Sequence, residues 1–249
     1  MIEDIVKWIK AYSENNNLNT LVVGISGGID SALVSTLCSM TGIETVVVSL
    51  PIYQKEDQLH RARNHGKWLL EKYKNVIFIE KDLSNLFDEF KSTFLESEIT
   101  PLSLANSRSR LRMTTLYQIA GAKCGMVVGT GNKVEDFGVG FFTKYGDGGV
   151  DISPIGDLTK TQVRNLSVKL GIINEIIIAD PTDGLWDDEK TDEQQIGATY
   201  EELEWAMGFN GSIEDLDKRE LDVYSIYNRL NKLNKHKMIE IPVFKQKIN

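Results

Sequence analysis

Residues 21–31, which read LVVGISGGIDS, constrain the fold of this chain more than any other stretch. The first five are apolar or small, as in a strand buried on both faces of a parallel sheet. After Asp30 the apolar residues recur at helical spacing, so the two adjacent glycines mark a sharp turn from strand to helix. Such a turn directs backbone N–H groups outward at the positive end of the helix dipole. We therefore predict a cradle for an anion at this turn, formed by Gly24, Ile25, Ser26, Gly27, Gly28, Ile29, Asp30 and Ser31.

The side chains of this cradle indicate that the anion is a phosphate group accompanied by a metal ion. Glycines allow an oxyanion to approach where a Cβ atom would collide, and Ser26 and Ser31 add hydroxyl donors. Asp30 would repel a bare phosphate, which favours a bridging Mg²⁺. No Gly-Lys-Ser/Thr follows the glycines and the pattern is not G-x-G-x-x-G, so this is neither of the two commonest nucleotide loops. The alternative is an ordinary tight turn that binds nothing.

The rest of the chain alternates between strand and helix patterns. We expect strands at 45–50, 76–79 and 126–130, and helices at 2–15, 55–73, 83–94, 101–125 and 158–170, with a further helix beginning at Thr199. Alternation of this kind implies right-handed crossovers and predicts an α/β fold, a doubly wound parallel sheet flanked by helices. A later stripe of Val223, Tyr227 and Leu230 is typical of core packing. Without a repeat or a convincing linker, residues 1–249 are expected to form one domain.

A second polar loop, residues 129–136, also follows a predicted strand. Open α/β sheets bind ligands outside the carboxyl ends of their strands, so this loop and the cradle are expected to face each other across one site. The carboxylates of Asp30 and Glu135 would then be suited to hold Mg²⁺. Residues 141–151 form a Gly-rich loop with aromatic, acidic and lysine side chains, a mixture that favours a functional loop. The charge-dense residues 186–193 fit a solvated loop or a lid over the site equally well.

The composition limits the class of protein. The chain has 41% hydrophobic and 26% charged residues, as soluble globular proteins do, and its net charge of −8 argues against a nucleic-acid surface. No apolar run is long enough to span a bilayer and no signal peptide is apparent, so no membrane partner is expected and the cytoplasm is the expected location. Cys38 and Cys124 lie in apolar runs and are expected to be buried thiols in a reducing compartment.

The hexapeptide at residues 26–31 resembles the pyrophosphate loop of the N-type ATP pyrophosphatases, and the order of motifs along the chain resembles that of the ammonia-dependent NAD synthetases. The matching motifs are residues 24–31, the Arg108, Arg110 and Arg112 helix, residues 129–133 with Glu135, and the segments 142–147, 151–154, 158–162, 181–182, 191–193 and 236–237. This resemblance implies a Rossmann-like fold of the adenine nucleotide alpha hydrolase type and a homodimer. It also implies that ATP adenylates nicotinate adenine dinucleotide (deamido-NAD), which ammonia then attacks to give NAD, AMP and pyrophosphate.

The resemblance also assigns roles to individual residues. Beyond the cradle, the implied ATP contacts are Thr130, Lys160 and Thr182, and the implied deamido-NAD contacts are Arg110, Lys144, Asp151, His236 and Lys237. Asp30 and Glu135 are the implied Mg²⁺ ligands, and Asp147 is by its position the candidate for deprotonating ammonium. The segment from Glu135 to Lys144 is one residue longer than in many relatives, which leaves Asp136 as the alternative ligand.

Two other functions are compatible with the same nucleotide loop. One is an ATP pyrophosphatase that acts on another acceptor, as GMP synthetases and tRNA-modifying enzymes do, although a tRNA enzyme would favour a basic surface. The other is a nucleotide-binding sensor of similar fold that binds ATP and forms no AMP. Pyrophosphate release that depends on deamido-NAD would separate both from an NAD synthetase.

Overall fold

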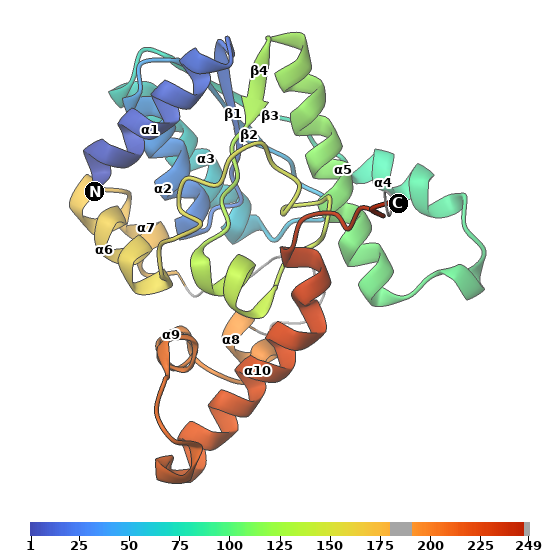
Figure 1. Ribbon diagram of the computed structural model, residues 1–249. Helices are drawn as coiled ribbons and strands as arrows, with labels where there is room; N and C mark the ends of the chain where they lie inside the picture. The colour runs from blue at the N-terminus through green and yellow to red at the C-terminus, as the bar shows by residue number, and fades with distance from the viewer. Residues whose placement is uncertain (180–190, 247–249) are drawn as a thin grey trace.

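The computed structural model describes residues 1–179 and 191–246 of the chain. Its centre is a parallel sheet in the order β3-β2-β1-β4 (Figure 1), made of β1 (Thr20–Gly24), β2 (Glu44–Ser49), β3 (Val76–Glu80) and β4 (Gly125–Val127). Just beyond β4, Val128 bridges Ile152 in parallel orientation. The chain runs from β1 outward to β2 and β3 and then returns to place β4 on the other side of β1, as in a doubly wound sheet.

Helices cover both faces of this sheet. One face carries α1 (Ile2–Asn15), α2 (Ile29–Met40), α3 (Glu56–Lys72), α6 (Lys160–Leu170) and α7 (Asn174–Ile177), and the other carries α4 (Ser84–Ser92) and α5 (Pro101–Ala122). Successive residues of β1 serve opposite faces, because Leu21 and Val23 pack with α2 while Val22 packs with α5. The predicted α/β class and doubly wound parallel sheet are therefore confirmed.

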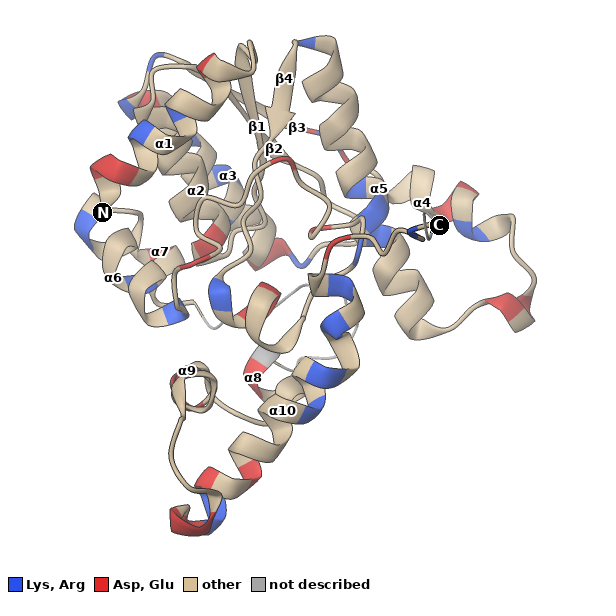
Figure 2. Ribbon diagram, in the orientation of Figure 1, with Lys and Arg blue, Asp and Glu red and all other residues tan. Residues whose placement is uncertain are grey.

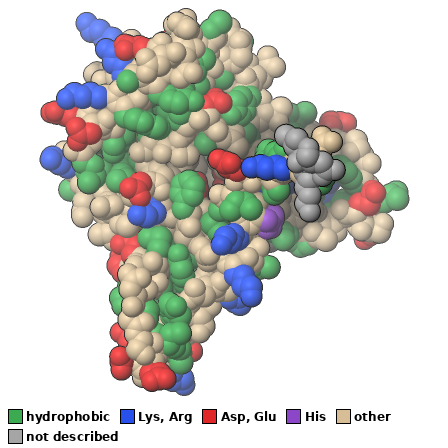
Figure 3. Space-filling model, in the orientation of Figure 1, with side chains coloured by type: hydrophobic (Ala, Val, Ile, Leu, Met, Phe, Trp, Pro, Cys, Tyr) green, Lys and Arg blue, Asp and Glu red, His purple; other side chains and the backbone are tan. Residues whose placement is uncertain are grey.

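A separate hydrophobic cluster lies beside the sheet. It is built by a π-helix, η2 (Lys133–Val139), with α8 (Asp192–Ile196), α9 (Tyr200–Gly208) and α10 (Lys218–Met238). In Figure 1, α9 and α10 project away from the sheet, and Figure 3 shows a band of hydrophobic side chains along this projection. The predicted stripe of Val223, Tyr227 and Leu230 packs into this cluster, as expected. Short 3₁₀ turns occupy Glu96–Glu98 and Ile213–Asp215.

Most predicted elements are present with shifts of a few residues at their ends. Thr199 caps α9 at the predicted start of that helix, and Thr159 caps α6; each accepts a hydrogen bond from a backbone N–H in the first turn. None of the described helices is both long and apolar enough to cross a membrane. The assignment of the whole chain to one domain stays a prediction.

The expectation of two buried thiols is right for Cys38 and wrong for Cys124. Cys38 is buried in α2, whereas Cys124 is exposed. Cys124 has a φ of +48° and lies in the turn between α5 and β4, where its carbonyl accepts a hydrogen bond from the Asn19 N–H at 2.8 Å. The turn interrupts the apolar run and brings this side chain to the surface.

A buried histidine, His65, joins α3 to α2 behind the cradle. Because of it, we expect the free energy of unfolding to fall at acidic pH. The His65 Nε2 atom lies 2.9 Å from Ser35 Oγ, and its ring stacks on Trp68 with the centroids 5.5 Å apart. Burial lowers the pKa of His65 from 6.5 to about 4. Between pH 6.5 and pH 4, His65 is therefore protonated in the unfolded chain but neutral in the folded chain. As the pH falls toward 4, the free energy of unfolding falls by about 3 kcal/mol.

Urea denaturation at several pH values between 7 and 4 measures this loss. In His65→Gln the decline between pH 6.5 and 4 should become shallower, because glutamine cannot take up the proton. His60→Gln, a change at an exposed histidine, should leave it as in the parent chain. Equal declines in all three proteins would refute the assignment.

Candidate active site

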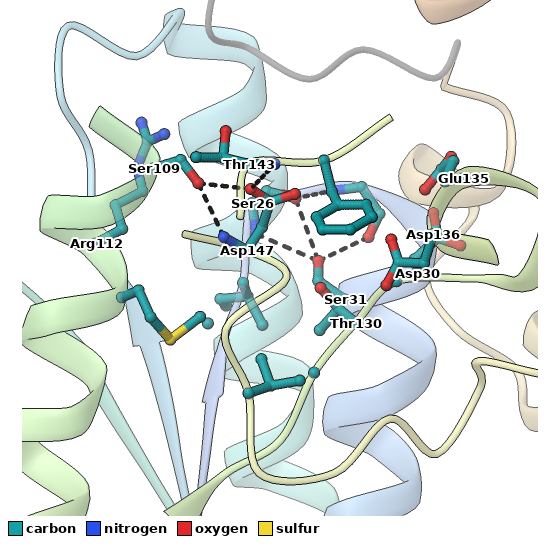
Figure 4. Close-up of a pocket in the computed structure, with 18 of the residues that line it drawn as sticks. Ser26, Asp30, Ser31, Ser109, Arg112, Thr130, Glu135, Asp136, Thr143 and Asp147 are labelled. Carbon is teal, nitrogen blue, oxygen red and sulfur yellow. Dashed lines mark hydrogen bonds between the residues drawn. The ribbon is translucent and has the colours of Figure 1, made fainter. Parts of the chain in front are cut away.

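The strand-to-helix turn after β1 has the predicted cradle form. Gly27 adopts a φ of +83°, and a Cβ atom there would lie 2.4 Å from the carbonyl oxygen of Gln58 in α3. The Ser31 hydroxyl accepts from the Ser26 N–H at 3.3 Å and donates to the Gly28 carbonyl at 3.0 Å, which closes the turn (Figure 4). Glycine at position 27 is therefore required both by the backbone conformation and by the close approach of α3.

The N-terminus of α2 leaves amide groups without helical partners. α2 begins at Ile29 after Gly28, which has no side chain to cap it. The first amide to bond back is that of Ala32, which donates to the Gly28 carbonyl at 3.2 Å. The N–H groups of residues 29–31 precede this bond, so they lie at the positive end of the helix dipole without partners inside the helix. This arrangement can bind an anion.

A cavity of about 820 Å³ opens in front of the cradle, at the carboxyl ends of β1 and β4. This is the switch point of the sheet, where the connections after the neighbouring strands β1 and β4 run in opposite directions. The predicted residues that line it are the whole cradle, Thr130, Glu135, Lys160, Arg110, Lys144, Asp147, His236 and Lys237. Residues expected to work together from distant parts of the sequence thus share one cavity, large enough for a nucleotide-sized ligand.

The side chains predicted to hold Mg²⁺ face one another across a lysine ammonium group. Lys160 Nζ lies 2.5 Å from Asp30 Oδ2 and 3.0 Å from Glu135 Oε1. Each carboxylate also accepts a hydrogen bond from a neutral donor, since the Asn132 Nδ2 group donates to Asp30 Oδ1 at 3.0 Å and the Tyr200 hydroxyl donates to Glu135 Oε1 at 2.5 Å. The Tyr200 ring centroid is 4.6 Å from the ammonium. These five side chains form a buried polar group at the edge of the cavity.

The charges in this group shift one another's protonation. Burial by itself lowers the pKa of Lys160, but the charges of Asp30 and Glu135 outweigh burial and raise it. Burial raises the pKa of Asp30, and the charge of Lys160 lowers it by less, so the net shift is upward. Burial also raises the pKa of Glu135, but the charge of Lys160 and the hydrogen bond from Tyr200 lower it by more, so the net shift is downward. The lysine therefore stays charged and balances two carboxylates.

Asp30 and Glu135 fit the needs of Mg²⁺, which takes one or two carboxylates and completes its shell with water and phosphate oxygens. Among the described residues no cluster of three or more His, Cys, Asp or Glu could hold a metal ion. The neighbouring Asp136 lies beside Asp30 in Figure 4, but Lys160 bridges Asp30 to Glu135. This pairing favours Glu135 over Asp136 as the metal ligand.

The π-helix η2 carries both Glu135 and Asp136. A π-turn holds one residue more than an α-helical turn, and in η2 Glu135 contacts Lys160 together with Asp30. Burial, and then the charges of Glu135, Asp147 and Asp30, raise the pKa of Asp136 well above its ordinary value. The cavity therefore contains a further carboxyl group that favours its neutral form.

Asp147 is fixed by two hydrogen bonds to the same oxygen. Its Oδ1 atom accepts from Ser109 Oγ at 2.6 Å and from the Thr143 N–H at 3.0 Å. A Cβ atom on Gly146 would lie 2.2 Å from Ser109 Oγ, so the loop approaches α5 closely. Burial raises the pKa of this carboxyl. Asp147 is thus a carboxyl group held in place by α5 and by its own loop, on the lining of the cavity.

Basic side chains also line the cavity. Arg110 Nε donates to the Lys144 carbonyl at 3.2 Å, and Lys144 Nζ donates to the His236 carbonyl at 3.2 Å. Lys237 Nζ donates to the Gly140 and Phe142 carbonyls. Figure 2 shows Lys and Arg on α5 and on the C-terminal half of α10, where these segments approach each other. A positive wall thus explains how a chain of net charge −8 can present a site for an anion.

Two predicted residues are not placed in this cavity. The Asp151 carboxylate accepts from the Val127 N–H at 2.7 Å and from the Tyr117 hydroxyl at 3.1 Å, so it ties β4 to α5 outside the cavity lining. Its contact with a substrate stays a prediction. Thr182 lies outside the described residues, as do residues 186–190 of the segment expected to be a loop or a lid.

The contacts of several side chains at the site had no clear signal in the sequence, including those of Arg112, which belongs to the matched Arg108, Arg110 and Arg112 helix. Arg61 Nε donates to the Gly27 carbonyl at 3.3 Å, and Arg112 donates to Leu50 O and to Gln54 Oε1 at 2.9 Å each. Arg61 and Arg112 both line the cavity. Tyr200 reaches Glu135 from the neighbouring helical cluster. Only the packing of helices reveals these contacts, because each partner is distant in the sequence.

The fold and the site together define a class of protein: an α/β nucleotide-binding protein with a phosphate cradle at its switch point and a lysine-bridged pair of carboxylates beside it. Comparison with known proteins identifies the family. Residues 1–242 match the family described as NAD synthase. The chain therefore belongs to the NAD synthase family.

Individual relatives agree with this assignment. The chain is 38% identical to the NH(3)-dependent NAD(+) synthetase of Carboxydothermus hydrogenoformans over 86% of its length and 88% of the relative's. It is 37% identical to that of Finegoldia magna, over 87% of each chain. Among solved structures, the NMN synthetase of Francisella tularensis superposes with a TM-score of 0.88 at 28% identity, covering 98% of this chain and 97% of that chain. The NH3-dependent NAD synthetase of Campylobacter jejuni, with a nitrate ion, gives 0.78 at 26% identity and the same coverage.

The cradle geometry predicts that Gly27→Ala will impair ATP binding. Alanine at a φ of +83° costs about 1 kcal/mol or more, and its Cβ atom would also collide with the Gln58 carbonyl. Because the collision must displace the turn, the Kd for ATP should rise by about tenfold or more, as measured by titration calorimetry.

Gly42→Ala is the matched control. Gly42 also has a positive φ, +77°, but a Cβ atom there would meet nothing within 4 Å. Both variants should lose stability from the backbone strain, and only Gly27→Ala should lose affinity for ATP. Unchanged ATP binding by Gly27→Ala would contradict the cradle assignment.

Proposed function

We propose that this chain amidates deamido-NAD with ammonia in an ATP-dependent reaction that yields NAD, AMP and pyrophosphate. The observation that carries the proposal is the shared cavity, in which the phosphate cradle and the Asp30–Lys160–Glu135 group face a wall of basic side chains. The reaction needs a site for the ATP phosphates and another for an anionic dinucleotide, close enough for one to react with the other. Membership of the NAD synthase family supports the same activity.

The first step is the attack of the substrate carboxylate on the α-phosphorus of ATP. Negative charge then builds up on the departing pyrophosphate, and the amides of the cradle with Ser26 and Ser31 lie at the positive end of α2 to stabilise it. Mg²⁺ held by Asp30 and Glu135 would supply further positive charge to the phosphates when bound. Arg110, Lys144 and Lys237 would bind the deamido-NAD anion on the other side of the cavity.

The second step is the attack of ammonia on the adenylated carbonyl, which expels AMP. Ammonium must first lose a proton, and we assign this proton transfer to Asp147. Its Oδ1 atom is fixed by Ser109 and Thr143, which holds Oδ2 in one position in the cavity. Burial favours the neutral form of Asp147, so its carboxylate is a stronger base than an exposed aspartate.

A homodimer is part of this proposal. The resemblance on which Asp151 was assigned to the substrate implies a dimer, and Asp151 is an exposed residue outside the cavity of one chain. A second copy placed against α5 could bring this residue toward the substrate of its partner. Measurement of the mass in solution by light scattering tests the dimer.

Nicotinate mononucleotide is a second candidate substrate. The NMN synthetase of Francisella tularensis superposes with a TM-score of 0.88, against 0.78 for the NAD synthetase of Campylobacter jejuni. The sequence relatives favour the dinucleotide, since those of Carboxydothermus hydrogenoformans and Finegoldia magna are NAD synthetases. Both candidates carry the same nicotinate carboxylate, so they differ only in whether the adenylate half of the substrate must be bound.

The purified chain should form NAD from deamido-NAD, MgATP and ammonium, with one AMP and one pyrophosphate for each NAD. Chromatography of the nucleotides measures all of these products. Nicotinate mononucleotide, xanthosine monophosphate and tRNA, each offered separately, should release less pyrophosphate than deamido-NAD. Asp30→Ala should lower the rate by about 100-fold or more, because it removes one proposed metal ligand from the phosphates.

Three outcomes would count against the proposal. ATP binding without AMP formation would indicate a nucleotide-binding sensor. Pyrophosphate release driven by xanthosine monophosphate or tRNA would indicate another ATP pyrophosphatase. Faster amidation of nicotinate mononucleotide than of deamido-NAD would replace the dinucleotide with the mononucleotide as the substrate.

Asp147→Asn should lower the rate of NAD formation by about 100-fold or more at neutral pH, as loss of a general base does. A higher pH supplies ammonia that is already deprotonated, so the rate of the variant should rise with pH more steeply than that of the parent. Asp157→Asn, a change at an exposed carboxylate paired with Lys133, is the control and should leave the pH–rate profile unchanged. If Asp147→Asn keeps the parental rate at every ammonium concentration, Asp147 is not the base.

A further inference from the structure

The position of the Lys160 ammonium group bears on how a metal ion enters the site. This group touches both Asp30 and Glu135, at 2.5 and 3.0 Å, and its side chain is only 7% exposed. Lys160 is the first residue of α6, so its flexible four-carbon stem reaches the carboxylates from the rim of the cavity. The ammonium therefore occupies the space between the two carboxylates that suit Mg²⁺.

A metal ion and this ammonium cannot share that space. Mg²⁺ binds carboxylate oxygens at about 2.1 Å, and an ammonium already in contact with the same oxygens would lie against it. Two cations at such a separation also repel each other strongly in a buried site. Occupancy by the metal ion thus requires Lys160 Nζ to leave at least one of the two carboxylates.

The carboxylates themselves are held in place independently of the lysine. Asn132 donates to Asp30 Oδ1 at 3.0 Å, and the Tyr200 hydroxyl donates to Glu135 Oε1. Both donors are neutral and both belong to segments other than α6. When Lys160 moves, these two hydrogen bonds keep the carboxylates in position for another cation.

The cavity offers Lys160 another anion once a nucleotide is bound. Lys160 and the cradle residues line the same cavity, and the Asp30 that Lys160 contacts is itself a member of the cradle. Phosphates bound at the cradle would therefore lie within the range of a long lysine side chain. A mobile point charge suits a phosphate as well as it suits a carboxylate.

We propose that Lys160 is an exchangeable counter-ion that fills the metal position in the nucleotide-free chain and moves to the phosphates of ATP, so that a divalent ion binds only together with the nucleotide. The inference rests on the proposed function, because it takes ATP and Mg²⁺ as the ligands of this cavity. It assigns to Lys160 a role beyond contact with ATP: the lysine prevents the metal ion from binding before the nucleotide does. It also keeps two buried carboxylates from facing each other without a compensating charge.

The experiment measures Mn²⁺ binding to the whole chain by electron paramagnetic resonance of free Mn²⁺, because carboxylates bind Mn²⁺ as they bind Mg²⁺. The parent chain should bind Mn²⁺ weakly alone and about tenfold or more tightly with an ATP analogue that cannot be cleaved. Lys160→Met should bind Mn²⁺ about tenfold or more tightly than the parent without any nucleotide. In Lys160→Met, the ATP analogue should then increase the affinity for Mn²⁺ only slightly.

Lys133→Met is the matched control, since Lys133 lies in η2 beside Glu135 but pairs with the exposed Asp157. It should bind Mn²⁺ as the parent does. Adding Glu135→Gln to Lys160→Met should remove the gain, because it removes one of the two carboxylates. Lys160→Gln provides a second test should the methionine variant be too unstable to purify, and Mn²⁺ alone should raise its Tm by more than that of the parent.

The outcomes separate this inference from the proposed function. If the parent chain binds the ATP analogue with Mn²⁺ and makes NAD, but neither Lys160 variant gains affinity for Mn²⁺, the exchange is refuted and the proposed function stands. If the parent chain binds neither ATP nor Mn²⁺ with ATP, the proposed function fails and the exchange fails with it. A gain in both Lys160 variants that Lys133→Met lacks supports the exchange.

Discussion

The contact of one buried ammonium group with two carboxylates joins the parts of this site. Lys160 begins α6, Asp30 lies in the first turn of α2, and Glu135 lies in the π-helix that follows β4. Two carboxylates could not be buried at this separation without a positive charge between them. The ammonium therefore connects three segments that the sheet brings near one another.

The surrounding structure makes this contact possible through close backbone approaches. Gly27 lets the cradle lie against α3, and Gly146 lets the loop that carries Asp147 lie against α5. Both approaches occur at the carboxyl ends of the strands, where parallel sheets open toward a ligand. The helical cluster of α9 and α10 then closes one side, with Tyr200 bonded to Glu135 and Lys237 bonded to the 140–142 backbone. The cavity is thus shared between the sheet and its helical neighbour.

The distribution of charge within the cavity matters more than the net charge of the chain. Asp30 and Glu135 lie together around Lys160, whereas Arg110, Lys144 and Lys237 gather around the loop 140–147 and α10, and Asp147 lies in that same loop. The first group suits a metal ion, the basic side chains suit an anionic dinucleotide, and the Asp147 carboxylate suits an ammonium ion. A single cavity with both signs of charge can therefore bring together the several charged reactants of an amidation driven by ATP.

The parallel sheet, the cradle and the nearness of the two polar loops could be predicted from the amino-acid sequence. These follow from local patterns: apolar runs for buried strands, glycines at a sharp turn, and the rule that ligands bind at the carboxyl ends of parallel strands. The motif order added Lys160, Arg110, Lys144 and the residues of α10, which line the cavity as expected. Four further features could be seen only in the folded chain: Lys160 bridges Asp30 and Glu135, Tyr200 and Arg61 reach the site, Asp151 ties β4 to α5, and Cys124 is exposed. Each of these depends on how helices far apart in the chain pack together, and no local pattern of residues carries that information.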